Sequence, residues 1–149
     1  MAVLVDTNIL VRLANTADSN NAIADRAIML LHRCSETVHI TAQNLVEFRN
    51  VATRPKIVNG LGMSNSDTEA KAAEFEAGFP LLEETPALFL AWKSLVGAAG
   101  VIGKQVHDAR LVAVCHVHKV THVLTFNVAQ LTTLATFGPG LIVVDPSTV

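Results

Sequence analysis

The chain has 149 residues, a common length for one domain, and half of them are apolar, which is enough to fill a substantial core. The net charge of −2 and the lack of a basic tail argue against a protein that holds nucleic acid by bulk positive charge. No signal peptide and no membrane-length apolar stretch are present, so we expect one cytoplasmic domain over residues 1–149 and no membrane contact.

In chain order, short β-branched runs alternate with segments whose apolar residues recur at helical spacing. We expect strands at residues 3–5, 38–41, 81–82, 120–124 and 141–144. We expect helices at residues 9–13, after Asp18-Ser19 as far as residue 34, and at 42–53, 67–77, 88–99, 108–118 and 128–136. Gly97, Gly100 and Gly103 interrupt the helical pattern and predict a loop there.

The two cysteines, Cys34 and Cys115, each lie in an apolar run of helical spacing. Cys34 ends a stripe formed by Ile23, Ala27, Leu30 and Leu31. We therefore expect both thiols to be free and buried.

Alternating strands and helices predict βαβ units and an α/β fold, with a central, mostly parallel sheet of about five strands in a three-layer α/β/α arrangement. In open sheets of this kind, ligands bind beyond the carboxyl ends of the strands. Asp6 directly follows the first expected strand, and Thr125, Phe126 and Asn127 directly follow the fourth. The sequence therefore predicts a functional site that joins these two segments.

Three carboxylates are candidates for that site, and each also has a simpler interpretation. Asp6 and Asp108 stand where a helix begins, and an aspartate there can serve only as a cap or as a partner of the helix dipole. Glu47 lies on a polar stripe of the 42–53 helix and can be an ordinary solvated side chain. Their order and surroundings, rather than any one of them alone, favour a shared function.

Four segments together resemble the PIN-domain family, in particular the VapC-like toxins of bacterial toxin–antitoxin pairs. They are VLVDTNIL (3–10), TAQNLVEFRNVATRP (41–55), GKQVHDARLVAV (103–114) and VLTFNVAQL (123–131), and they span nearly the whole chain in the family's order. The resemblance implies a PIN-like fold and a metal-dependent endoribonuclease that hydrolyses RNA phosphodiester bonds.

The resemblance also implies roles for individual residues. The family's acidic positions fall on Asp6, Glu47 and Asp108, and its Thr-x-Asp/Asn motif falls on Thr125 and Asn127. Relatives often carry a further aspartate where this chain has the neutral Gln130. The acidic cluster is therefore thinner here than in many family members.

Hard divalent cations prefer oxygen ligands, so these acids fit Mg²⁺ or Mn²⁺. We expect Asp6 and Asp108 to bind the metal directly, and Glu47 to bind it through water or to orient the attacking water. Thr7 and Asn8 would support these ligands by hydrogen bonds, as outer residues of metal sites usually do. Thr125 and Asn127 would position phosphate, water or a second metal.

The implied partners are RNA, preferably unpaired, a small antitoxin protein and a second copy of the chain. A charged content of only 16% is consistent with a surface hidden in a homodimer.

Two other functions stay open at this point. One is a haloacid-dehalogenase-like phosphatase, although its second aspartate is replaced by Asn8. The other is a PIN fold that has lost catalysis and only binds a partner, which the neutral Gln130 allows.

Overall fold

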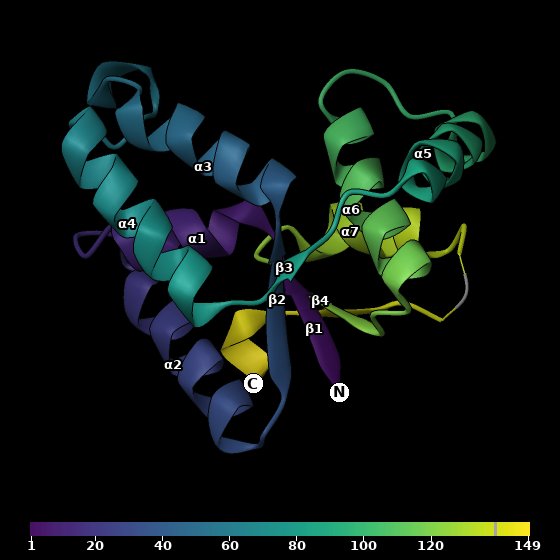
Figure 1. Cartoon of the computed structure of the whole chain (residues 1–149), viewed down its shortest axis with the longest axis horizontal. Helices are drawn as coiled ribbons and strands as arrows, with labels where there is room; N and C mark the ends of the chain where they lie inside the picture. The colour runs from purple at the N-terminus through teal and green to yellow at the C-terminus, as the bar shows by residue number, and fades with distance from the viewer. Residues whose placement is uncertain (139) are drawn as a thin grey trace.

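The computed structural model describes residues 1–138 and 140–149 and has the expected alternation of strands and helices (Figure 1). The strands are β1 (Ala2–Val5), β2 (Thr37–Thr41), β3 (Leu81–Leu82), β4 (His122–Leu124) and β5 (Ile142–Val144). The helices are α1 (Thr7–Ala14), α2 (Asn21–Arg33), α3 (Ala42–Thr53), α4 (Asn65–Gly78), α5 (Pro86–Ala99), α6 (Gln105–His118) and α7 (Val128–Ala135), with short 3₁₀ turns η1 (Lys56–Val58) and η2 (Pro146–Thr148). None of these described helices is long and apolar enough to cross a membrane.

The five strands form one parallel sheet in the order β3-β2-β1-β4-β5. The chain builds outward from β1 to β3 and then continues on the other side of β1 with β4 and β5. The direction of winding therefore changes between β1 and β4, where open sheets form a ligand-binding crevice. Val5 pairs with Leu124 in this register, so the strands end side by side and Asp6 and Thr125 follow at the same edge.

Helices cover both faces of the sheet, as the three-layer prediction requires. Successive residues of a strand point to opposite faces. Val3 and Val5 of β1 pack in a core with residues of α1, α2, α3 and α4, whereas Leu4 packs in a second core with residues of α5, α6 and α7. The predicted α/β/α architecture with a five-stranded central sheet is confirmed.

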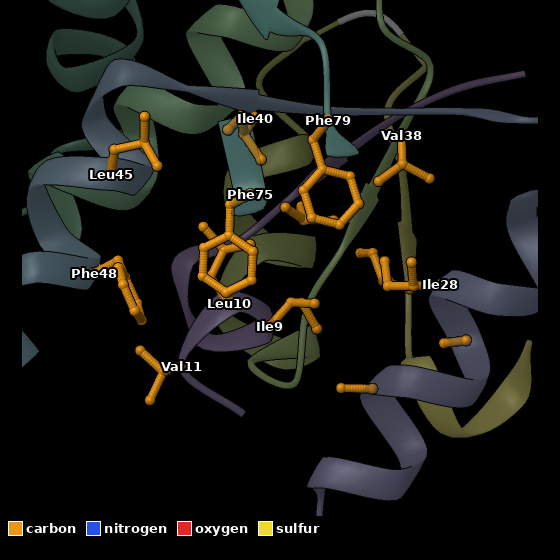
Figure 2. Packing of buried hydrophobic residues seen from close by; sticks show 14 of the residues in the cluster. Ile9, Leu10, Val11, Ile28, Val38, Ile40, Leu45, Phe48, Phe75 and Phe79 are labelled. Atoms are coloured by element: carbon orange, nitrogen blue, oxygen red, sulfur yellow. The ribbon is translucent and has the colours of Figure 1, made fainter. Parts of the chain in front are cut away.

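The core on the α1–α4 side anchors α3, the helix that carries Glu47. Phe48 is 0% exposed and meets Phe75 of α4 edge to face, with ring centroids 5.1 Å apart and planes inclined at 82° (Figure 2). Phe75 in turn lies 6.2 Å from Phe79. Successive helical residues are turned by about 100°. Burial of Phe48 therefore fixes the direction of the neighbouring Glu47 side chain.

The buried stripe of α2 differs from the expected one, and the prediction for Cys34 was wrong. Cys115 is buried as expected, but Cys34 is exposed. The residues of α2 that enter the core are Ala24, Ala27, Ile28 and Leu31. The expected and the observed buried residues both have helical spacing, but the observed set covers a slightly rotated face of the helix. Cys34 comes after the last turn of α2, where the chain leaves the helix.

The glycines after residue 96 were expected to interrupt the helix, and only the later ones do. The helix α5 continues through Gly97 to Ala99. It ends at Gly100, whose φ of 61° places it in the left-handed conformation that glycine adopts without strain. The break thus falls at the residue where the backbone requires glycine.

Two glycines give a matched test of this packing. A Cβ at Gly60 would lie 1.8 Å from the backbone oxygen of Arg54, whereas a Cβ at Gly97 would meet nothing within 4 Å. We expect Gly60→Ala to lower the free energy of unfolding by about 1–3 kcal/mol, because backbone must move. Gly97→Ala should raise it by roughly 0.5–1 kcal/mol, because alanine favours a helix interior. Urea denaturation of both variants measures the difference, and equal stabilities would contradict the described α3–α4 turn.

Candidate active site

The end of β1 and the end of β4 are joined by hydrogen bonds around Asp6. The Thr125 hydroxyl donates to Oδ2 of Asp6 at 2.7 Å, and it accepts from Nδ2 of Asn8 at 3.0 Å and from the backbone N–H of Asn127 at 2.9 Å. Asn8 Nδ2 also donates to Oδ2 of Asp6 at 2.9 Å, and Asn8 Oδ1 accepts from the backbone N–H of Phe126 at 3.2 Å. The hydroxyl of Thr125 thus uses its one donor and both acceptor positions. The Asp6 carboxylate is held firmly at the strand edge.

Neither aspartate serves as a side-chain cap. Asp6 occupies the N-cap position of α1, but its side chain makes no capping hydrogen bond and is used by Thr125 and Asn8 instead. The helix α6 begins with Lys104 at its N-cap, and Asp108 lies in the first turn, inside the helix. The simpler capping interpretation therefore explains neither carboxylate, although the dipole of α6 still favours a negative charge at Asp108.

Glu47 is also more constrained than a solvated glutamate. Its side chain is 32% exposed. Thr7 donates its hydroxyl to Oε2 at 2.7 Å, and Gln43 donates from Nε2 to Oε1 at 2.8 Å. The buried Asn44 in turn donates from Nδ2 to the Thr7 hydroxyl at 3.1 Å. Residues of α1 and α3 thus fix both carboxylate oxygens.

Gln43 and Arg110 are positioning residues that the sequence did not reveal. Besides Glu47, the Gln43 amide donates to the backbone oxygen of His107 at 3.0 Å, and its Oε1 accepts from Arg110 at 3.1 Å. Arg110 also pairs with Glu84. These contacts tie α3 to α6 across the sheet edge. Gln43 precedes Glu47 by one helical turn, which is a usable signal, but nothing in the sequence pairs it with Arg110.

Asn44 supports the site from beneath and was not predicted to do so. It forms a reciprocal capping pair with Thr41 at the start of α3, and it is 0% exposed. The Thr41-x-x-Asn44 spacing is that of a capping box, which could have revealed the pair. Its remaining donor reaches Thr7. The cap that starts α3 therefore also orders the hydroxyl that holds Glu47.

The three predicted carboxylates influence one another electrostatically. The pKa of Asp6 is raised from its ordinary value of 3.8 to about 6; burial is the largest cause, the hydrogen bond from Thr125 opposes it, and the charges of Asp108 and Glu47 add to it. The pKa of Asp108 is raised by burial and by the charge of Glu47, with Lys104 and His107 acting in the opposite direction. The fold therefore brings Asp6, Glu47 and Asp108 into one electronegative region.

The remaining predicted residues are placed less uniformly. Thr7, Asn8 and Thr125 all belong to the network that holds the acids. Asn127 is exposed and contributes its backbone N–H to that network, while its side chain caps nothing. Gln130 is exposed in the first turn of α7 and lines a pocket between this helix, the end of α5 and the start of α6. The catalytic role expected for the Asn127 side chain stays a prediction.

The donor set fits a hard divalent cation, in an open rather than an enclosing site. Among residues 1–138 and 140–149, no three or more histidine, cysteine or acidic side chains are grouped so that they could hold a metal ion. Mg²⁺ is commonly held by only one or two carboxylates, together with several waters and a substrate phosphate. The neighbouring acids offer oxygen ligands only, and a cation would offset the burial and the mutual repulsion that raise the pKa of Asp6 and Asp108.

The raised pKa of Asp6 gives a pH-dependent stability. The native carboxyl binds its proton more tightly than the unfolded one, so stability through this group falls as pH rises from about 4 to about 6, by up to about 3 kcal/mol. Asp6→Asn removes the charge and keeps an acceptor for Thr125. In metal-free buffer we expect the variant to unfold at a higher temperature than the wild type above about pH 6 and to lose that advantage below about pH 4.

Thermal unfolding in EDTA across this pH range measures the effect. Asp25→Asn is the control, because Asp25 is an exposed aspartate on α2. If the Asp6→Asn variant is less stable than the wild type at every pH, the ionised Asp6 carboxylate does not destabilise the native protein as its raised pKa implies.

Several solved structures have a similar fold. The structure of VapBC2 from Rickettsia felis bound to a promoter DNA fragment matches with a TM-score of 0.72 and 17% identity, over 97% of this chain and 98% of that one. VapBC-1 from nontypeable Haemophilus influenzae matches with a TM-score of 0.67 and 16% identity, over 99% of each chain. VapC20 from Mycobacterium tuberculosis, a sarcin–ricin loop cleaving toxin, matches with a TM-score of 0.60 and 21% identity, over 81% of this chain and 86% of that one.

Because these sequence identities are low, the structural likeness establishes the fold alone. No curated protein matches the sequence. The model of the PIN domain matches residues 3–132, which include every segment that carries the resemblance and all of the acidic positions. The family assignment from the sequence is confirmed, and the chain belongs to the PIN-domain family.

Proposed function

We propose that residues 1–149 form a single PIN-like nuclease domain that hydrolyses RNA phosphodiester bonds with Mg²⁺ or Mn²⁺. The observation that carries the proposal is the meeting of Asp6, Glu47 and Asp108 at the sheet edge where the winding direction changes, within a PIN-family fold. Asp6 directly follows β1, Glu47 lies on α3 and Asp108 on α6, and hydrogen bonds hold the carboxylates of Asp6 and Glu47. Such an arrangement has no evident structural purpose, because mutual repulsion and burial work against folding.

The similar structures support the toxin interpretation. Proteins described as VapBC share this fold over nearly their whole length, and VapC20 is described as a sarcin–ricin loop cleaving toxin. We propose that this chain is likewise the toxin of a pair and that a small antitoxin protein is its partner. The low content of charged residues supports a homodimer as its assembly.

A bound divalent cation supplies two things in phosphodiester hydrolysis: it neutralises charge on the phosphate and makes a water molecule more acidic. Asp6 and Asp108 would hold it as direct ligands. Glu47, whose two oxygens are fixed by Thr7 and Gln43, would orient the attacking water and accept its proton. Both Asp6 and Asp108 must then be ionised to bind a cation, which their raised pKa values make dependent on pH.

The neutral polar residues would position these acids and the substrate. Asn8 and Thr125 hold Asp6 in one orientation, as outer ligands do at metal sites. The exposed Asn127 precedes α7 and donates its backbone N–H to Thr125, and its side-chain amide would bind a phosphate oxygen or a water.

The two alternative functions are separated by activity. Membership of the PIN family favours the nuclease over the phosphatase. A catalytically inactive PIN domain has the same fold as an active one. The neutral Gln130, at a position where relatives often carry an aspartate, is consistent with such an inactive domain. Assays of RNA cleavage and of p-nitrophenyl phosphate hydrolysis, each in Mg²⁺ and in Mn²⁺, distinguish the three.

The direct test replaces the acids with their isosteric amides. We expect Asp6→Asn and Asp108→Asn each to slow metal-stimulated RNA cleavage by a factor on the order of 100 or more, since metal stabilisation of the transition state is worth several kcal/mol. The exposed Asp25→Asn should cleave at the wild-type rate. Wild-type rates in both site variants, with all proteins folded by circular dichroism, would show that the site is misassigned.

The positioning of Glu47 gives a second test. Gln43→Leu removes the amide that joins Glu47 to Arg110 and His107, and we expect kcat to fall by about 10–100-fold with little change in KM. Asn50→Leu is the matched control, because Asn50 is an exposed amide on the same helix. An equal loss in both variants, or a loss confined to KM, would contradict a role of Gln43 in orienting Glu47.

A further inference from the structure

A pocket of about 340 Å³ is lined by residues of the helices that carry Asp108 and follow Asn127, and the mechanism above does not use it. It is formed where the end of α5 and the start of α6 face one side of α7. We call it the α7 groove. Its lining residues are Ala99, Gly100, Val101, Gln105, Ala129, Gln130, Thr133, Leu134 and Phe137. The volume lies at the small end of the range for ligand pockets, which is about 300–1,000 Å³.

The groove begins within one helical turn of the candidate active site. Gln105 precedes Asp108 by three residues on α6, and Gln130 follows Asn127 by three residues at the start of α7. Three helical residues span about 4.5 Å along the axis. The two glutamines that line the groove therefore lie one helical turn from Asp108 and from Asn127. This spacing is short enough for a nucleotide whose phosphate is held at the acids to extend its base toward the groove.

The chemistry of the lining selects a neutral, partly polar ligand. No residue of the α7 groove carries a charge, so nothing in it attracts a phosphate or a charged peptide. Two exposed glutamine amides offer donors and acceptors together, and a glutamine amide can pair with the edge of adenine through both groups. Ala99, Gly100 and Ala129 leave room for a flat ring, and Phe137, which is 47% exposed, presents an aromatic face.

We propose that the α7 groove binds one unpaired nucleobase of the RNA, beside the phosphodiester held at Asp6 and Asp108. This inference rests on the proposed nuclease function and adds the part of the site that selects sequence. Gln105 and Gln130 read the base edge, and Phe137 and the small residues accept its ring. Gln130 thus serves recognition at the position where an additional acid was expected from the family.

The first experiment needs no activity. The ¹⁵N-labelled wild-type protein is titrated by NMR, without metal, with adenosine, guanosine, cytidine and uridine. We expect shifts confined to the side-chain amides of Gln105 and Gln130 and to the backbone of Ala129 and Thr133, with affinities that differ by about tenfold between the best and the worst nucleoside. No groove shifts with any nucleoside, or equal shifts with inorganic phosphate alone, would overturn the proposal.

Two variants test the groove itself. Ala129→Leu fills it and Gln130→Ala removes one amide, while Thr132→Leu changes an exposed residue of α7 outside the lining. We expect the first two to weaken nucleoside binding by about tenfold and the control to bind as the wild type does. Thermal unfolding shows whether each variant is folded. If Ala129→Leu does not fold, nucleoside binding by Gln130→Ala alone tests the groove. Unchanged binding in both groove variants contradicts the proposal.

Cleavage of oligonucleotides with a randomised base next to the cut separates this inference from the proposed function. If nucleosides bind the groove but no RNA is cleaved, the base site stands and the nuclease proposal fails. If RNA is cleaved with a base preference that Ala129→Leu leaves intact, the nuclease proposal stands and the base site fails. Groove shifts caused by an antitoxin peptide and by no nucleoside would also overturn the base site, in favour of a protein-docking surface.

Discussion

The burial of the Asp6 carboxylate at the junction of β1 and β4 is the constraint on which the rest of the site depends. A buried charge is unfavourable unless hydrogen bonds or an opposite charge compensate it. Here the compensation comes from Thr125 and Asn8, and it is incomplete, because the pKa of Asp6 remains raised to about 6. The parallel register that pairs Val5 with Leu124 makes it possible, since it brings the residues that follow both strands to the same place.

The two helical layers meet around this constraint through polar contacts. On one side of the sheet, Phe48 and the aromatic residues of α4 hold α3 by apolar packing, which does not depend on the charge state of the acids. On the other, α6 carries Asp108 and is linked to α3 by the contacts of Gln43 with Arg110 and His107. The apolar cores thus fix the helices, and a small set of hydrogen bonds fixes the acids between them. The apolar cores therefore hold the fold together even though the burial and repulsion of the acids work against it.

Much of the fold followed from sequence patterns that act over short distances. Strand positions came from β-branched runs, and the 42–53 helix ends before Arg54-Pro55, because proline disfavours helical geometry in the residue before it. Asp6 and Thr125 could be placed together because a parallel sheet fixes where its strands end. Local spacing could not decide which of two overlapping apolar stripes of α2 is buried, so Cys34 was misplaced.

The polar links of the site were harder to foresee for a related reason. Gln43 lies near Glu47 in sequence, but Arg110 comes from a helix 67 residues further on and acts through an amide that no periodicity identifies. Asn44 lies three residues before Glu47 and is fully buried, since Thr41 and Thr7 satisfy its side-chain amide. Hydrogen bonds between distant segments depend on the finished packing, and only residues in a known motif can be assigned before it.

The neutrality of Asn127 and Gln130 can be understood from the same electrostatics. Each carboxylate added beside Asp6, Glu47 and Asp108 would raise the cost of keeping them ionised, and the cluster already perturbs two of its members without a cation. An amide in either place adds hydrogen-bonding capacity with no charge. Asn127 contacts the network around Asp6 through its backbone N–H, and Gln130 lines an uncharged groove. A thin acidic cluster and a neutral neighbouring groove are therefore complementary: charge is confined to where a cation and a phosphate would meet, and the adjoining surface is left to recognise a group that carries none.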